Sequence, residues 1–386
     1  MSRLTIRLVE RQTTRVVLPP REVAFLLTQA RELVEVRPCF QPNVYRITPR
    51  GFVGWFDGPS RRFAIRPQVP WPTLQLLLGF RPTRQGHEAT GELETELLML
   101  MAEEFLHRLG KLERNGLFPG YHEQDSVAPF LRGKLRTVEQ LREAAVRAFP
   151  DRFQIRESVL GLDTPWNRIL RATASHLLAQ PHLPSATRKR LQVAICPLEC
   201  IPAGQWEEND FSAAIADRRL SHYQPVLEVC RLIHSGFTAA STQDGGSTAF
   251  LMNLGQVFER YLGMQLVRAY ANLPNWSVQV QPRLNAGVAE FQPDFIISKD
   301  GQAEMVFDAK WKHPRPEASD LHQVLAYGNV TGAKHVGLVY PGRRLAKRSV
   351  ILRGRTQRLT LLQVPIFGMV TDNWLPRLSR WLRKHE

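Results

Sequence analysis

Two aspartates and a lysine stand at a spacing that suits the hydrolysis of a phosphodiester bond. Asp294 follows a proline at the start of one apolar stretch, and Asp308 and Lys310 end the next one. The residues between them predict a β-hairpin with Lys299–Asp300–Gly301 at its turn. Because alternate residues of a strand point to the same face, we expect Asp308 and Lys310 to lie together, with Asp294 brought close by the hairpin.

This trio has the chemistry of a Mg²⁺ site. Mg²⁺ prefers oxygen ligands, and two aspartates with a backbone carbonyl supply half of an octahedral shell. The ion polarises a phosphate and activates a water, while Lys310 orients that water and offsets charge in the transition state. We therefore expect Asp294 and Asp308 to bind Mg²⁺ and all three residues to be catalytic. The alternative is a turn aspartate and a surface ion pair, which the apolar neighbours Val306 and Phe307 disfavour.

Three further residues are candidates for supporting roles. Glu259 lies in a predicted helix and supplies a third acid for the metal or its water; its alternative role is an ion pair with Arg260. Gln323 and Tyr327 are four residues apart on the helix that follows the hairpin, so their side chains share a face. They would steady the lysine or the DNA backbone; alternatively, Tyr327 belongs to the core and Gln323 to the helix surface.

Hydrophobic patterning divides the chain into regions that must position these side chains. Residues 1–85 alternate apolar and polar side chains between turns, which predicts a small β-rich domain. Residues 86–236 have a helical period, with acids expected opposite the apolar face. Residues 237–249 form a polar, Gly-rich linker, and residues 250–386 predict an α/β domain. The residues that set the helical period at its start are Leu93, Leu97, Leu98, Met101, Phe105 and Leu109.

The α/β domain is expected to alternate strands with helices. Phe307 and Ala309 should point into its core, away from Asp308 and Lys310. The predicted helices are 250–270, 320–329 and 374–384, and the predicted strands are 276–280, 291–297, 304–311 and 335–340. The fold class is therefore a mixture of α/β and β structure with a helical middle region.

Composition narrows the partners and the compartment. The formal charge of +15 on 386 residues favours a polyanion, because neutralised phosphates release counterions. Cys39, Cys196, Cys200 and Cys230 resemble reduced thiols rather than a disulfide framework. No apolar run reaches the roughly 18 residues of a membrane span, and no signal peptide is evident. We expect a cytoplasmic protein without membrane contact and, lacking a P-loop motif, without a nucleotide site of its own.

The motifs resemble those of known nucleases. PDFII (293–297) and FDAKWK (307–312), with the Q-x-x-x-Y helix, resemble the RecB-like branch of the PD-(D/E)xK nuclease superfamily. Most of the chain is similar to the McrC family, the nuclease subunits of McrBC modification-dependent restriction systems. The matching stretches are GFVGWFDG, FAIRPQVPWPTLQLLL, GYHEQDSVAPFLRGKLR, LDTPWNRILRATASHLL, LSHYQPVLEVCRLI, LGQVFERYLG and HQVLAYGNVTGAKHVGLVYP. The resemblance implies a PD-(D/E)xK nuclease fold for residues 250–386.

The resemblance also implies a partner and a target. McrC proteins act with McrB, an AAA+ GTPase that recognises modified cytosine, and McrB hexamers hold McrC through its β-rich N-terminal domain. By position, Asp294, Asp308 and Lys310 match the family's catalytic residues, and Glu259 matches the acid of the preceding helix. We accordingly expect an endonuclease that stimulates GTP hydrolysis by a McrB-like hexamer and cleaves double-stranded DNA carrying modified cytosine.

The residues that contact the GTPase, and the function of the chain, each have alternative interpretations. Arg50, Arg61 and Arg62 within the hairpin-rich stretch Asn43–Arg66 are the best candidate contacts, although for any single residue an ordinary solvated turn is the favoured explanation. An autonomous nuclease of repair or mobile-element transfer would cut without a partner. A non-catalytic, DNA-binding adaptor of the motor would have no need to hold two acids close together against their repulsion.

Overall fold

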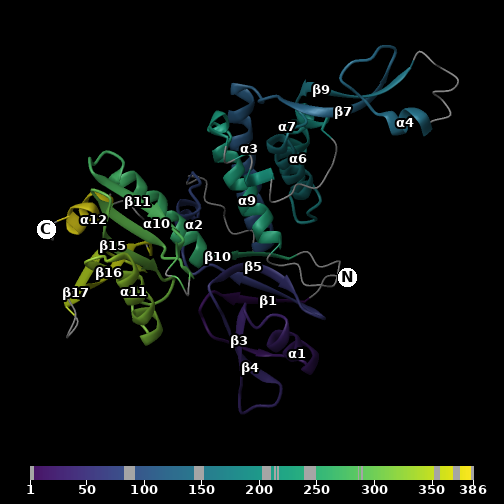
Figure 1. Cartoon of the computed structure of the whole chain (residues 1–386). Helices are drawn as coiled ribbons and strands as arrows, with labels where there is room; N and C mark the ends of the chain where they lie inside the picture. Colours follow the sequence, from purple (N-terminus) through teal and green to yellow (C-terminus); the bar gives the residue numbers. More distant parts are fainter. Residues whose placement is uncertain are drawn as a thin grey trace. The chain divides into compact units, whose positions relative to one another are not determined.

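The computed structural model has mixed α/β architecture, as the sequence predicts (Figure 1). The described residues are 4–81, 92–142, 152–201, 210–212, 214, 217–238, 249–285, 287, 290–351, 357–367 and 374–383. They form two compact units, one within Met1–Glu88 and Ala240–Glu386 and the other within Ala89–Ala239. The expected domain boundary at residue 85 and residues 239–248 of the expected linker lie outside the described residues.

The N-terminal part of the first unit is built from two sheets and two short helices. One sheet has the order β1-β6-β5-β10 and the other the order β2-β4-β3, and apolar side chains of both pack with α1 into one core. Leu26, Ile47 and Phe63 are fully buried there. The bounds are β1 Leu4–Val9, β2 Thr14–Val17, α1 Pro20–Thr28, β3 Val34–Pro38, β4 Val44–Pro49, β5 Phe52–Asp57, β6 Arg61–Arg66 and α2 Trp71–Leu77.

One strand of the sheet that contains β1, β6 and β5 comes from a segment much later in the sequence. Phe250–Asn253 forms β10, which pairs antiparallel with β5. The prediction of one helix over 250–270 is therefore wrong at its start, because a four-residue apolar run cannot distinguish strand from helix by period. Gly54 permits the pairing, since a Cβ there would lie 2.0 Å from the carbonyl oxygen of Phe250. Asn253 then accepts N–H bonds from the first turn and begins α10.

A six-stranded mixed sheet forms the C-terminal part of the same unit. Its order is β11-β14-β15-β16-β18-β17, with β16 parallel to both of its neighbours and the other pairs antiparallel. The helices α10 and α11 both pack against it. The bounds are α10 Leu254–Tyr270, β11 Trp276–Val280, β12 Leu284–Asn285, β13 Glu290–Phe291, β14 Phe295–Lys299, β15 Gln302–Ala309, α11 Ala318–Thr331, β16 His335–Gly342, β17 Ala346–Ile351, β18 Arg358–Pro365 and α12 Trp374–Arg383.

The β14–β15 hairpin turns where the sequence predicts. Its two-residue loop is Asp300–Gly301, and both residues have positive φ, at +49° and +81°. A tight loop of this kind favours Asp-Gly because its twist matches that of the flanking strands. Phe295 consequently pairs with Phe307, and both rings are buried. The hairpin therefore fixes which side chains meet at its open end.

The second unit combines helices with a three-stranded sheet. The residues predicted to set the helical period of α3 are all buried, but Glu94 and Glu96 are buried too, so the acids do not form a solvated face. The sheet, in the order β7-β9-β8, corrects the expectation of helices here; its polar strands lack a clear apolar period. The bounds are α3 Leu93–Asn115, β7 Gly120–Ala128, β8 Lys134–Leu135, α4 Thr137–Arg142, β9 Phe153–Gly161, α6 Pro165–Leu178, α7 Ser185–Ala194 and α9 Gln224–Thr238. No helix of the described residues is long and apolar enough to cross a membrane.

A buried histidine makes the stability of the second unit sensitive to acid. Burial, with a smaller contribution from nearby His176, lowers the pKa of His234 from 6.5 to about 4. Nε2 of His234 lies 2.9 Å from Oγ1 of Thr173. Because the unfolded chain takes up the proton at higher pH, stability present above pH 6.5 is expected to fall by about 3 kcal/mol as the pH drops towards 4. Urea unfolding at several pH values measures this.

The matched variant for this prediction is His234→Gln. The amide keeps a hydrogen bond to Thr173 but does not titrate, so its unfolding free energy should vary less between pH 7 and 4 than that of the wild type. The same pH dependence in both proteins would show that His234 is not responsible.

Candidate active site

The β14–β15 hairpin brings the three predicted catalytic residues together. Asp294 stands just before β14, Asp308 is the penultimate residue of β15, and Lys310 follows that strand. Oδ2 of Asp294 accepts a hydrogen bond from the backbone N–H of Ala309 at 2.6 Å. Nζ of Lys310 lies 2.7 Å from Oδ2 of Asp308. The structure therefore brings the two acids and the lysine together at one end of the hairpin.

Gln323 and Tyr327 connect the lysine to the loop before Asp294. Nζ of Lys310 donates to Oε1 of Gln323 at 2.9 Å, and Nε2 of Gln323 donates to the Tyr327 hydroxyl at 2.7 Å. Tyr327 in turn donates to the backbone carbonyl of Gln292 at 3.2 Å. The chain of hydrogen bonds thus runs from the end of β15 through α11 to the start of β14. It restricts the rotamers of Lys310, because its long side chain is held at two points.

Glu259 reaches the site from α10 with the help of a residue that the sequence did not suggest. Nε2 of Gln281 donates to Oε1 of Glu259, and the backbone N–H of Gln281 donates to the carbonyl of Asp294 at 2.8 Å. Gln281 has a φ of +49°, a left-handed conformation that costs a non-glycine residue energy and is common at functional sites. Its position after β11 holds Glu259 next to Asp294.

The acids of the site repel each other in a buried setting. Burial raises the pKa of Asp294 to about 8, and the carboxylates of Asp308 and Glu259 contribute to this rise. Burial also raises the pKa of Asp308, although the adjacent Lys310 ammonium opposes it. Only 3% of Asp308 is exposed, so water screens this repulsion weakly. Closely spaced buried acids of this kind are typical of functional sites.

The donor set fits Mg²⁺. The buried Oδ2 of Asp308 is paired with the Lys310 ammonium at 2.7 Å, and no other group of the described residues donates a hydrogen bond to it. A divalent cation between Asp294 and Asp308 would use this oxygen and relieve the repulsion. The part of the chain that the structure describes holds no group of three or more His, Cys, Asp or Glu side chains arranged as a metal site. Two carboxylates suffice for Mg²⁺, which keeps several water ligands.

A second lysine anchors the helix that carries Gln323. Glu317 and Asp320 form a capping box at the start of α11, each carboxylate accepting from the other's backbone N–H. Nζ of Lys312 lies 2.9 Å from Glu317 and 2.7 Å from Asp320. The sequence signal for this arrangement is an acid three residues after another acid, just before the predicted helix. Lys312 therefore ties the residues after β15 to α11.

Trp311, two residues after β15, joins this strand to the N-terminal part of the unit. Its Nε1 donates to Oε1 of Glu10 at 2.9 Å, and Glu10 is fully buried. Arg11 also donates to Oε1 of Glu10, at 3.0 Å. The indole lies 5.3 Å from the ring of Phe258 on α10, measured between centroids. The residue after Lys310 is thus held by both parts of the first unit.

Two of the three arginines named as candidate GTPase contacts have side-chain partners within the protein. Arg62 forms a bidentate ion pair with Asp57, at 2.7 and 3.1 Å, and its side chain is only 14% exposed. Arg61 donates to the carbonyl of Val17 at 2.7 Å. Only Arg50 is an exposed turn residue of the three. The expectation of free basic tips is therefore wrong for Arg62, because β5 and β6 are interior strands.

Gln323→Ala is expected to slow DNA cleavage by about 10- to 100-fold, since it frees the Lys310 ammonium from its acceptor. Gln323 is exposed, so the fold should be unaffected. Cleavage rates at saturating Mg²⁺ measure the effect, and exposed His322, the preceding residue, provides the control variant His322→Ala. Equal rates for both variants would exclude a role for Gln323 in positioning Lys310.

Comparison with solved structures identifies the architecture. A chain of the Thermococcus gammatolerans assembly of McrB AAA+ hexamers with bound McrC is similar, with a TM-score of 0.56 and 18% identity over 98% of this chain and 99% of that chain. A chain of the cryo-EM structure of the T. gammatolerans McrBC complex matches with a TM-score of 0.43 and 18% identity, over 70% of this chain and 89% of that chain. The first likeness establishes a shared fold.

The family follows from the sequence itself. The family model of the McrBC 5-methylcytosine restriction system component matches residues 60–341. The chain therefore belongs to this family. No curated protein sequence matches the chain.

Proposed function

We propose that the chain is a Mg²⁺-dependent DNA endonuclease with a PD-(D/E)xK site in its C-terminal part. The observation that carries this proposal is the meeting of Asp294, Asp308 and Lys310 at one end of the β14–β15 hairpin. The chain of hydrogen bonds from Lys310 through Gln323 also supports the proposal, because an ordinary surface ion pair does not need side chains that hold its lysine in place.

Each of these residues would have its own role in phosphodiester hydrolysis. Asp294 and Asp308 would hold Mg²⁺, which when bound polarises the phosphate and lowers the pKa of a water. Lys310 has three N–H donors, of which one is used by Gln323 while another faces Oδ2 of Asp308. The third would orient the attacking water or donate to a phosphate oxygen as negative charge develops. Glu259 is placed to accept a hydrogen bond from a water beside Asp294.

We further propose that this nuclease is the cutting subunit of a cytoplasmic restriction system with a McrB-like AAA+ GTPase. It would stimulate GTP hydrolysis and cleave double-stranded DNA with modified cytosine. Family membership and the shared fold with a chain of the McrB–McrC assembly support this partner. The charge of +15 supports DNA as the target, since a basic surface attracts phosphates.

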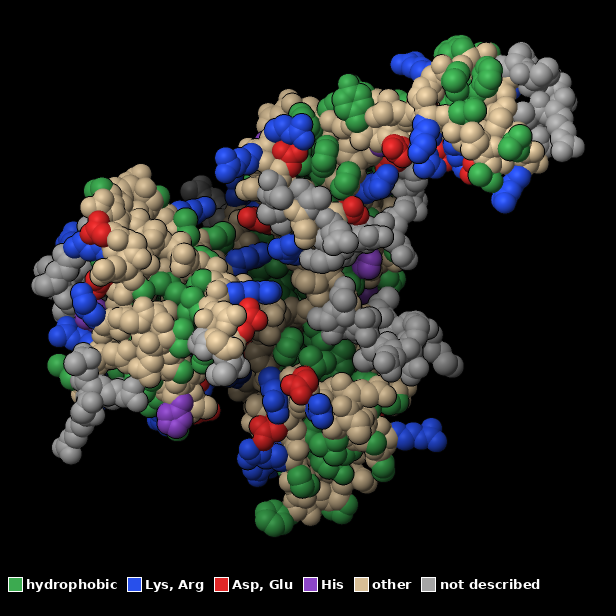
Figure 2. All heavy atoms as spheres, viewed as in Figure 1, with side chains coloured by type: hydrophobic (Ala, Val, Ile, Leu, Met, Phe, Trp, Pro, Cys, Tyr) green, Lys and Arg blue, Asp and Glu red, His purple; other side chains and the backbone are tan. Residues whose placement is uncertain are grey.

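An apolar surface formed by the three-stranded sheet of the second unit, the loop after β7 and α4 is suited to the GTPase. Seven of the seventeen exposed large hydrophobic side chains among the described residues lie between 121 and 160 (upper right in Figure 2). Concentrations of this kind mark protein interaction sites. The seven are Tyr121, Val127, Phe130, Leu131, Val138, Leu141 and Leu160. They extend the expected partner surface beyond the N-terminal region.

Reconstitution tests the whole proposal. The chain is purified with and without a McrB-like GTPase and given GTP, Mg²⁺ and a duplex that contains either cytosine or 5-methylcytosine. Cleavage is expected only of the modified duplex, only with the GTPase and only when EDTA is absent.

Each alternative function predicts a different outcome, one in this reconstitution and the other in a restriction assay in cells. Cutting of either duplex by the chain alone would identify an autonomous nuclease. Full restriction of foreign DNA in cells by the Asp294→Ala variant would identify a non-catalytic adaptor.

A further inference from the structure

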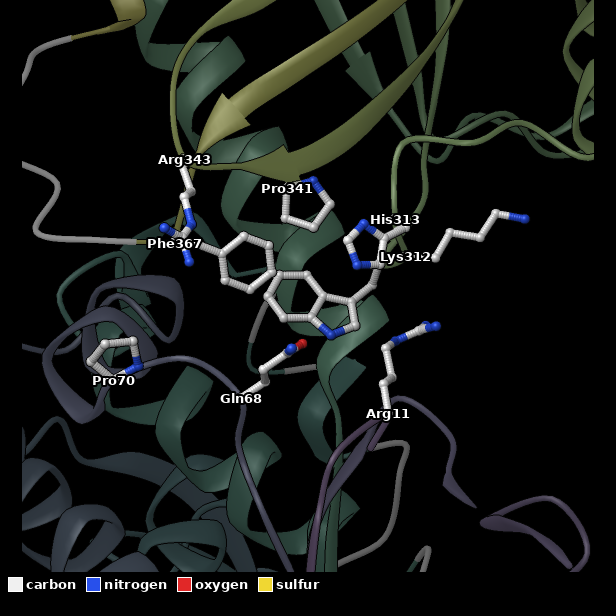
Figure 3. A pocket seen from close by; sticks show the side chains of 9 residues that line it. Arg11, Gln68, Pro70, Lys312, His313, Pro341, Arg343 and Phe367 are labelled. Atoms are coloured by element: carbon white, nitrogen blue, oxygen red, sulfur yellow. The ribbon is translucent and has the colours of Figure 1, made fainter. Parts of the chain in front are cut away.

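A pocket of about 650 Å³ begins at the residues that directly follow Lys310 (Figure 3). Trp311 and Lys312 line it from the catalytic strand, and Arg11 and Gln68 line it from the N-terminal part of the unit. None of the three predicted catalytic residues and the three predicted supporting residues lines it, so the pocket is separate from the proposed metal site. Its volume lies within the range of roughly 300–1,000 Å³ that is common for small-molecule sites.

The pocket combines rings with cations. Phe367 and Trp311 lie 5.9 Å apart between ring centroids, and Trp311 is only 6% exposed, so it forms a deep wall. Arg11 and Lys312 are each paired with carboxylates outside the pocket. Arg343, by contrast, is exposed and forms no ion pair with another described residue. Figure 3 shows its side chain beside Phe367.

This combination matches the chemistry of a nucleotide. A base packs favourably against aromatic side chains, while an arginine takes the phosphate. The amide of Gln68 can donate to and accept from a base edge. Among the described residues no acidic side chain lines the pocket, which favours a phosphate there. A purely apolar ligand would leave the guanidinium of Arg343 and the amide of Gln68 unused.

The position of the pocket connects it with the strand being cut. The backbone N–H of Lys312 donates to the carbonyl of Lys310 at 2.9 Å, and the two residues are separated by at most about 7 Å of chain. Successive nucleotides of a DNA strand rise by about 3.4 Å. A nucleotide in the pocket therefore lies within a few positions of the phosphate at Lys310.

We propose that this pocket binds one unpaired nucleotide of the DNA strand, near the scissile phosphate. Its base packs against Phe367 and Trp311, and its phosphate contacts Arg343. A paired base is stacked inside the duplex, so the nucleotide must leave the helix or come from a single-stranded end. The proposal rests on the nuclease function above and adds a subsite to it.

Binding and crosslinking without cleavage test the subsite. The full chain carrying Asp308→Asn is mixed, in EDTA, with a fluorescent single-stranded oligonucleotide, and binding is followed by anisotropy. Adding Arg343→Ala is expected to raise the Kd at least fivefold. The matched control Arg348→Ala removes an equally exposed arginine from β17 and is expected to change the Kd less than twofold. An equal loss in both variants would mean a diffuse charge effect and would overturn the subsite.

The base is located by crosslinking. An oligonucleotide with 5-iododeoxyuridine is irradiated with the same protein, and the modified peptide is expected to contain Trp311 or Phe367. Crosslinks confined to other peptides would overturn the proposal. Displacement of the oligonucleotide by an equal concentration of a deoxynucleoside monophosphate would also overturn it, because the pocket would then be a site for free nucleotides. Because no step requires cutting, a failed cleavage assay beside an intact crosslink would remove the nuclease proposal and leave the pocket occupied by DNA.

Discussion

Asp308→Asn is expected to reduce Mg²⁺-dependent DNA cleavage by on the order of 10³-fold or more. The amide keeps the shape of the side chain but loses its charge, so the proposed metal would lose one of two anionic ligands. Lys310 also loses the partner 2.7 Å from its ammonium. Folding should survive, because the substitution removes repulsion with Asp294. Single-turnover cleavage with the GTPase present measures the first effect, and urea unfolding of the metal-free protein measures the second.

Asp300→Asn is the matched control on the same hairpin. Asp300 lies at the turn with a φ of +49°, a conformation that asparagine tolerates well. Its cleavage rate should equal that of the wild type. A rate for Asp308→Asn within tenfold of the Asp300→Asn rate would contradict the assignment of Asp308 as a metal ligand.

Trp311→Ala lowers the free energy of unfolding by about 3–5 kcal/mol. The substitution leaves a cavity next to Phe258 and removes the N–H that donates to Glu10 at 2.9 Å. Burial already raises the pKa of Glu10, so the carboxylate depends on its remaining donors. Urea unfolding monitored by circular dichroism measures the loss.

Trp311→Phe separates packing from hydrogen bonding. The ring still fills most of the space, but Glu10 loses the indole donor, so the loss should be about 1–3 kcal/mol. A loss below 1 kcal/mol for Trp311→Ala would show that Trp311 does not hold the catalytic strand to the N-terminal part of the unit.

The hairpin was predictable because its signals are local. An Asp-Gly turn between two apolar stretches specifies a two-residue loop, and the strand period then places Asp308 and Lys310 on one face. The spacing of Gln323 and Tyr327 likewise depends only on the helical period. The proximity of all these side chains follows with few assumptions, because the two elements are close in sequence.

Other parts of the site required the tertiary structure. Gln281 has no motif, yet its left-handed backbone holds Glu259 beside Asp294. Trp311 is part of the recognisable stretch after Lys310, but its partner Glu10 lies 301 positions away in the sequence. Contacts of such separation leave no periodic signal, since either residue could pack against many others.

The strands missed by pattern are short or exposed. Phe250–Asn253 became a strand because β5 offered an unpaired edge and Gly54 allowed close approach. In Gly120–Ala128 no side chain is fully buried, so no apolar alternation marks the strand. The hydrogen bonds to Phe153–Gly161, rather than a buried face, define it.

Asp294, Asp308 and Lys310 illustrate which features depend on the sequence alone and which depend on the tertiary structure. By itself the sequence determined the residue types, the hairpin and the shared face of Asp308 and Lys310, because turn chemistry and strand period act over a few residues. Only the tertiary structure decided how deeply the acids are buried, and hence how strongly they repel each other. It also decided that Lys310 is held by Gln323 and that Trp311 anchors the strand to Glu10, because these contacts depend on how distant elements pack.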